Sequence, residues 1–120
     1  MERRFRFPKS QRLTLNVEFQ RVRTEGLSVR GEILTLGVLK NATSSFAARA
    51  GFVTSKRVGR AVERNQIRRR LREIFRKHQH EIVPGVWIVT IASARAARTS
   101  FRALEDEWLH LARRASILAP

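Results

Sequence analysis

Hydrophobic residues recur along this 120-residue chain with two different periods, which divide it into helical and extended segments. Spacings of three and four predict helices over about 16–25, from near 56 to about 77, and over 101–115. Alternating or continuous apolar runs predict strands from Ser28 onward, over 32–39, over 46–54 and over 86–91. The order α-β-β-β-α-β-α predicts an α+β fold, an α/β sandwich with one sheet, in a single domain spanning residues 1–120.

Local signals suggest where the first and last helices begin and end. Residues 1–12 are basic and aromatic, and we interpret them as an irregular arm. Asn16 is suited to cap the first helix, and Gly26 to follow its last turn. Ser100 is suited to cap the last helix. The apolar residues of the first helix fall on one face: Leu15, Phe19 and Val22.

The helix near residues 56–77 has two contrasting sides. One side is an apolar stripe, predicted to face the core, of Ile67, Leu71, Ile74, Phe75, His78 and Ile82. The opposite side carries Asn65, Arg69, Arg72 and Arg76. Arg68 lies at one margin, and Arg70 and Lys77 at the other.

Charge is the unusual feature of the composition. The chain has 25 Lys and Arg against ten Asp and Glu, a formal net charge of +15. Such an excess repels itself in a compact fold, and phosphate backbones are the polyanions that most often neutralise it. Because cysteine is absent, disulfide scaffolds and thiolate sites are excluded. Without a long apolar run or a signal-like N-terminus, we expect a cytoplasmic protein with no membrane partner.

The arginine-rich side could simply be solvated, the usual role of a charged helix face. Solvated faces normally mix charges, because opposite charges four residues apart stabilise a helix and like charges destabilise it. Residues 56–77 instead hold ten basic residues against two acids. This pattern favours an RNA-binding or DNA-binding surface.

The segment SKRVGRAVERNQIRRRLREIFR, residues 55–76, closely resembles the signature of the bacterial ribonuclease P protein subunit. That signature has a basic pair, Val/Ile-Gly, Ala-Val, Arg-Asn and a second basic pair on a long helix. FPKSQRLTLNVEFQRVRTEG, residues 7–26, is similar to the first helix of the same family, so the resemblance covers nearly the whole chain.

The resemblance implies a function and a fold. Proteins of this family partner a catalytic RNA that removes the 5′ leader from precursor tRNA, using Mg²⁺ held by that RNA, with no obligatory protein partner. The resemblance therefore implies that this chain is a non-catalytic subunit of such an endoribonuclease. The implied fold is similar to the ribosomal protein S5 domain 2-like fold, with a left-handed βαβ crossover, an exception to the usual right-handed rule.

The resemblance also implies roles for individual residues. It assigns leader binding, in a cleft between the first helix and the sheet, to Phe19, with Arg12 and Arg23 as further candidates. Many members carry a second aromatic residue where this chain has Arg23. On spacing alone Phe19 also suits a core position, so both roles stay open. The residues assigned to docking on the catalytic RNA are Lys56, Arg57, Arg60, Arg64, Asn65, Arg68, Arg69, Arg72 and Arg76.

We find no catalytic or metal-binding constellation in the sequence. The acids of 105–107 point in different directions around a helix, and His78 and His80 diverge in the same way. Two alternatives remain: a ribosomal or general RNA-binding protein, and a protein ribonuclease acting without RNA. Cleavage of precursor tRNA without an RNA subunit would identify the second.

Overall fold

A four-stranded sheet forms the centre of the protein. The computed structural model describes residues 7, 9–40, 42 and 48–119. The strands are β1 (Leu27–Arg30), β2 (Leu34–Leu39), β3 (Arg49–Thr54) and β4 (Trp87–Ala92), in the spatial order β1-β2-β4-β3. The pairs β1–β2 and β2–β4 are antiparallel, whereas β3 and β4 are parallel. The predicted α+β fold with one sheet is confirmed.

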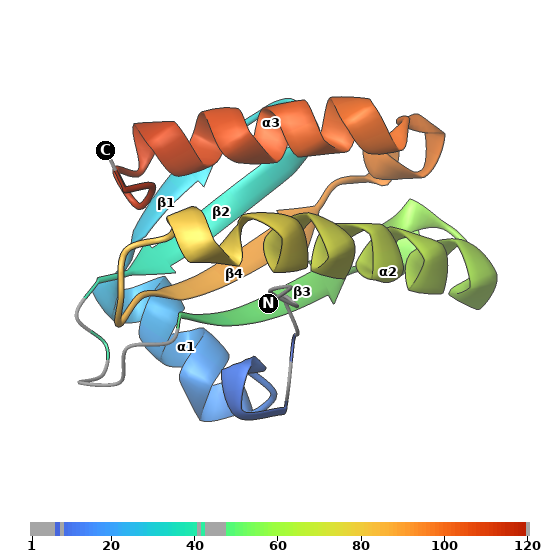
Figure 1. Ribbon diagram of the computed structural model, residues 1–120. Helices are drawn as coiled ribbons and strands as arrows, with labels where there is room; N and C mark the ends of the chain where they lie inside the picture. The colour runs from blue at the N-terminus through green and yellow to red at the C-terminus, as the bar shows by residue number, and fades with distance from the viewer. Residues whose placement is uncertain (1–6, 8, 41, 43–47, 120) are drawn as a thin grey trace.

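Helices cover the two faces of the sheet unequally (Figure 1). The α-helices are α1 (Asn16–Glu25), α2 (Ala61–His78) and α3 (Phe101–Arg114). Short 3₁₀ helices are η1 (Lys9–Gln11), η2 (Lys56–Val58), η3 (Gln79–Glu81) and η4 (Ala94–Arg98). The helices α2 and α3 lie side by side on one face, and α1 lies on the other. From β3 through α2 to β4 the chain turns in the left-handed sense expected from the resemblance.

The face under α2 and α3 holds the main core. In β2, Leu34, Leu36 and Val38 all point into it, as their alternation predicted. The apolar stripes of the two helices meet them there, with these residues fully or almost fully buried: Ile67, Leu71, Ile74, Phe75, Leu104, Trp108 and Leu111. The indole N–H of Trp108 donates to Thr90 Oγ1 over 3.1 Å, which satisfies the one polar atom that this side chain brings into the core.

The face under α1 is only partly covered. A smaller cluster of Leu13, Val22, Leu39, Trp87 and Val89 lies between α1 and the sheet. Trp87 is buried at the edge of this cluster, where the guanidinium groups of Arg21 and Arg49 lie 5.2 and 5.1 Å from its ring centre. Beyond the helix, Val53 and Ile91 keep 37% and 41% of their surface exposed. A nearly continuous apolar run such as 86–91 is typical of a strand buried on both faces, but Ile91 departs from this because the sheet is open there.

The first helix has its predicted bounds, but the structure corrects its cap and the segment that precedes it. Asn16 is the first helical residue and not the cap; Leu15 holds the cap position, and its N–H is bonded by the Glu18 carboxylate at 2.9 Å. Since Leu15 precedes the helix, the helical period does not apply to it, and it is 59% exposed. Gly26 is extended at φ −90° because the chain passes directly into β1. Within the supposed irregular arm, residues 9–11 are helical and Arg12 pairs with Ala50, while residues 1–6 and 8 lie outside the described residues.

The arginine-rich helix begins later than its charge pattern suggested. Lys56 and Arg57 belong to η2, and α2 starts only at Ala61. Gly59 separates the two elements with φ +145°, a conformation that disfavours any side chain. A Cβ there would also collide with the carboxylate of Glu63. Gly59 therefore forms a bend between η2 and α2. The strand predicted over 46–54 starts at Arg49, and residues 46–47 lie outside the described part of the chain.

Candidate nucleic-acid interface

The segment from η2 through the first three turns of α2 displays most of its cations without acidic partners. We call this set the arginine surface: Lys56, Arg57, Arg60, Arg64, Asn65, Arg68, Arg69 and Arg72. Within the described residues, no hydrogen bond or ion pair engages the side chains of Lys56, Arg57, Arg60, Arg64 or Arg69. Unpaired arginines offer planar, multidentate donors, which suits them to phosphate groups.

Arg68 is oriented by two neighbours. Its Nε donates to Thr54 Oγ1 at 2.9 Å, and its Nη1 donates to Asn65 Oδ1 at 3.2 Å. The Arg–Asn step of the signature therefore has a local physical role, since Asn65 holds Arg68 while its own amide N–H groups stay available. Thr54, at the end of β3, is a supporting residue that no sequence signal revealed, because its partner lies 14 residues away.

Arg12 and Arg72 meet at a small hollow between η1, β3 and α2. The hollow has a volume of about 90 Å³ and is also lined by Phe7, Gly51 and Phe52. Loss of hydration, followed by the positive charges of Arg12 and Arg68, lowers the pKa of Arg72 from its usual value. Arg12 and Arg72 thus line one hollow, where a phosphate would relieve the repulsion between their two guanidinium groups.

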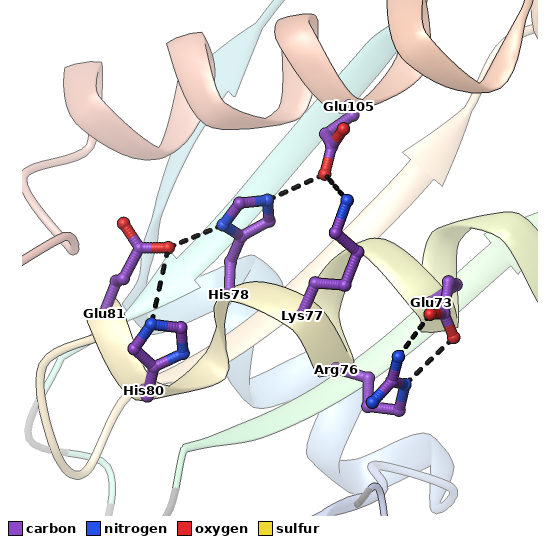
Figure 2. Close-up of polar contacts among 7 residues, drawn as sticks. All are labelled: Glu73, Arg76, Lys77, His78, His80, Glu81 and Glu105. Atoms are coloured by element: carbon purple, nitrogen blue, oxygen red, sulfur yellow. Dashed lines mark hydrogen bonds and ion pairs between the residues drawn. The ribbon is translucent and has the colours of Figure 1, made fainter. Parts of the chain in front are cut away.

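The C-terminal turns of α2 differ, because their cations are paired (Figure 2). Arg76 Nε donates to Glu73 Oε2 at 2.9 Å, and a second hydrogen bond joins Arg76 to the other carboxylate oxygen. Lys77 Nζ lies 2.8 Å from Glu105 of α3. Hydrogen bonds from Lys77 and His78 lower the pKa of Glu105. Arg76, assigned above to docking, is therefore already engaged by a carboxylate.

His78 serves as a bridge between α2 and α3. Its Nδ1 lies 2.6 Å from Glu81 and its Nε2 2.8 Å from Glu105, as Figure 2 shows. Its ring also stacks on Trp108, with 6.5 Å between ring centres. In the described part of the chain, no group of three His, Cys, Asp or Glu residues could hold a metal ion. Glu107, the last of the three consecutive acids 105–107, accepts hydrogen bonds from the backbone N–H groups of Ile33 and Leu34, which fixes the β1–β2 turn.

A second and different surface lies between α1 and the sheet. We call it the α1 groove; it has a volume of about 490 Å³, and its lining includes Phe19, Val22, Arg23, Val53, Val89 and Ile91. Most of this lining is apolar, with Arg23 exposed at one wall. Phe19 and Arg23 are thus brought together, whereas Arg12 lies in the separate hollow beside Arg72.

Phe19 lies at the boundary between the smaller core and the α1 groove. Its partly buried ring packs against the smaller core and lines the groove. A Cβ at Gly51 would lie only 2.7 Å from two carbons of this ring, so the missing side chain lets Phe19 rest on β3. Gly51 also lines the hollow of Arg12 and Arg72, so the two depressions adjoin at this residue.

An ion pair anchors α1 to the sheet beside the groove. Arg49 Nη1 lies 2.5 Å from Glu18 Oε2, and Glu18 Oε1 accepts the N–H groups of Thr14 and Leu15. Burial raises the pKa of Glu18, but these hydrogen bonds and Arg49 outweigh it, so the pKa is lowered overall. The charged pair fixes the helix that carries Phe19 and Arg23.

Within the described residues, no helix is long and apolar enough to cross a membrane.

Comparison with known sequences identifies what the chain resembles. The family model for Ribonuclease P matches residues 7–116. The chain is 40% identical over 111 residues to the ribonuclease P protein component of Roseiflexus sp. strain RS-1, covering 92% of this chain and 89% of the relative. The corresponding protein of Desulfovibrio desulfuricans is 35% identical over 114 residues, with 93% and 88% covered.

Comparison with solved structures gives the same result. The RNase P protein of Staphylococcus aureus superposes with a TM-score of 0.83 at 29% identity, covering 92% of this chain and 99% of that one. The RNase P protein of Thermotoga maritima, solved in complex with 1-(4-fluorophenyl)-2-thiourea, has a TM-score of 0.75 at 28% identity, covering 84% and 98%. The resemblance inferred from residues 55–76 and 7–26 is confirmed.

Proposed function

Since the chain belongs to the ribonuclease P protein family, we propose that it is the protein subunit of a ribonucleoprotein that removes the 5′ leader from precursor tRNA. In this role it binds two RNAs, a catalytic RNA and the substrate, in the cytoplasm and without another obligatory protein. The observation that carries the proposal is the presence of two chemically distinct surfaces on one small domain.

The arginine surface is proposed to dock on the catalytic RNA. Its unpaired guanidinium groups suit the sugar-phosphate backbone, which supplies most of the affinity in such complexes and makes it depend on salt. Arg68, held by Asn65 and Thr54, presents an oriented guanidinium group within this surface. Contacts of this kind position the protein on a folded RNA.

The α1 groove is proposed to hold the single-stranded leader. An extended strand exposes bases that stack on aromatic rings, for about 1–3 kcal/mol per base, while arginine contacts bases or phosphates. Phe19 and Arg23 supply these two contacts at one wall, and the exposed Val53 and Ile91 supply apolar floor. Arg12, in the adjoining hollow, suits a phosphate passing between the groove and α2.

Chemistry is assigned to the RNA, which in this proposal holds the Mg²⁺ ions that activate water. The protein contributes affinity, orientation and tolerance of low Mg²⁺, because its cations neutralise phosphates that metal ions would otherwise have to screen. No protein side chain is assigned to proton transfer or metal binding.

Reconstitution tests the proposal. Precursor tRNA is incubated with the protein alone, with a cognate catalytic RNA alone, and with both, across a Mg²⁺ series. We expect no cleavage by the protein alone, and a marked rise in cleavage at low Mg²⁺ when the two are combined. Cleavage by the protein alone would indicate a protein ribonuclease. An RNA activity unchanged by the protein would favour a ribosomal or general RNA-binding role.

A further inference from the structure

A second basic element lies beside the arginine surface, contributed by a distant part of the chain. The turn η4 precedes α3, and in the fold it packs against η2 and the first turns of α2. Figure 1 shows the start of α2 and the turn leading into α3 at the same end of the molecule. Two arginines of this turn, Arg95 and Arg98, are both exposed.

The turn that carries these arginines is held firmly. Ala96 is completely buried, so the middle of η4 is anchored in the core. Arg70 of α2 donates from Nη1 to the carbonyl of Thr99 at 3.2 Å, which ties the end of the turn to the arginine-rich helix. Thr99 Oγ1 donates in turn to the carbonyl of Arg95 at 2.7 Å. The backbone positions of Arg95 and Arg98 relative to α2 are therefore fixed by the fold.

The side chains of Arg95 and Arg98 are available to a ligand. Throughout the described residues, neither has a hydrogen-bond or ion-pair partner. Both line a hollow of about 350 Å³ together with Glu32, Ile33 and Thr99. One carboxylate faces two guanidinium groups there, which leaves the hollow with a net positive charge. This hollow therefore favours the binding of an anion over that of a cation or an apolar group.

We infer that Arg95 and Arg98 extend the RNA-docking surface onto η4, where they bind backbone phosphates of the catalytic RNA. This inference rests on the proposed function, since it takes the same RNA as the occupant of the arginine surface. The catalytic RNA is favoured over the substrate because η4 adjoins η2 and α2, while the α1 groove lies on the opposite face of the sheet. An RNA backbone that runs along α2 towards the N-terminal end of this helix would next reach η4.

Salt-dependent binding tests the inference. The variants Arg95→Ala, Arg98→Ala and their combination are titrated with the catalytic RNA at several salt concentrations. Each single change should lower the log–log slope by about 0.7–0.9, and the combination should weaken binding about 15- to 30-fold near 0.15 M salt. Folding should be preserved, which thermal melting checks, because neither side chain has an internal partner within the described residues.

Arg113→Ala is the matched control for loss of one positive charge. Arg113 is also exposed, but it lies near the far end of α3, roughly 20 Å along that helix from η4. It should leave the slope unchanged. If Arg95→Ala and Arg98→Ala change the affinity and the salt slope no more than Arg113→Ala does, η4 does not contact the RNA and the inference is wrong. This holds both when all three variants bind normally and when all three lose affinity equally.

Two further comparisons separate the sources of failure. Arg69→Ala tests the proposed function. If this variant also binds the catalytic RNA normally, docking through α2 is wrong. If Arg69→Ala weakens binding but Arg95→Ala and Arg98→Ala do not, only the inference is overturned. If the double variant binds the catalytic RNA normally but its holoenzyme captures precursor tRNA less tightly, the occupant is substrate, and the assignment to catalytic RNA is overturned. Footprints on the catalytic RNA should lose different nucleotides in the Arg69 and Arg95/Arg98 variants.

Discussion

The arginine surface and the α1 groove lie on opposite faces of one sheet and differ in almost every physical property. On the α2 face the core is closed, and what remains outside is charge: guanidinium groups that lack acidic partners in the described part of the chain. On the α1 face the sheet is left half open, and what remains is a mostly apolar hollow with one aromatic ring and one arginine. The first surface suits phosphate, and the second suits bases.

The difference shows that net charge alone does not locate function. Charge pairing divides α2 itself, since its first three turns keep unpaired cations while Glu73 and Glu105 engage Arg76 and Lys77 at its end. Glu73 of α2 and Glu105 of α3 thus limit the arginine surface to one end of the helix. That end is also where η4 brings further arginines.

The largest effect is expected on the arginine surface. Replacing Arg69 and Arg72 together by alanine should lower the log–log salt slope for catalytic RNA binding by roughly 1.4–1.8, and weaken binding about 15- to 30-fold near 0.15 M salt. Filter binding at four salt concentrations measures both. Arg76→Ala should have a smaller effect than either single change, because Glu73 already engages that guanidinium. Equal effects of all three would contradict the division of α2.

An intermediate effect is expected in the groove. Phe19→Ala should weaken binding of leader-bearing precursor tRNA to the holoenzyme by about tenfold, within the 1–3 kcal/mol expected for one stacked base. The salt slope should stay nearly constant, since no charge is lost. Binding of mature tRNA is the internal reference, and Val17→Ala, exposed on α1 outside the groove, is the control variant. Equal losses for precursor and mature tRNA would mean that Phe19 acts only through packing.

The smallest effect is expected at Arg23, where the two kinds of recognition meet. Arg23→Phe introduces the second aromatic residue that the family resemblance implies at this position, so affinity for the leader should change by less than about threefold. The salt slope should nevertheless fall by about 0.7, the value for one phosphate contact on a single strand. Arg113→Phe, at the far end of α3, is the matched control. A slope that does not move would show that Arg23 contacts bases and not phosphate.

Much of this fold follows from local patterns in the sequence. The alternation of Leu34, Leu36 and Val38 predicted the buried side of β2, and the stripe from Ile67 to Phe75 predicted the buried side of α2. Ser100 caps α3 as expected, its Oγ accepting the N–H of Ala103 at 3.2 Å. These features succeed because each depends on residues within one or two turns or strands of each other.

Features that depend on distant residues were missed. Two local assignments were also wrong: Asn16 is the first residue of α1 and not its cap, and α2 begins at Ala61 because Gly59 separates it from η2. The exposure of Ile91 follows from α1 covering only part of the sheet. The pairing of Arg76 could have been suspected from Glu73 three residues earlier, but that of Lys77 with Glu105 spans 28 positions.

By itself the sequence determined the excess of positive charge, the separation of α2 into an apolar and a basic side, and the motif that identifies the family. These are properties of residue type and short spacing, which the chain carries before it folds. Tertiary structure decided which cations keep acidic partners, that Arg12 approaches Arg72, that Phe19 rests on Gly51, and that η4 adjoins η2. Such relations arise only when the sheet brings distant segments together, because charge neutralisation and close packing act through space and not along the chain.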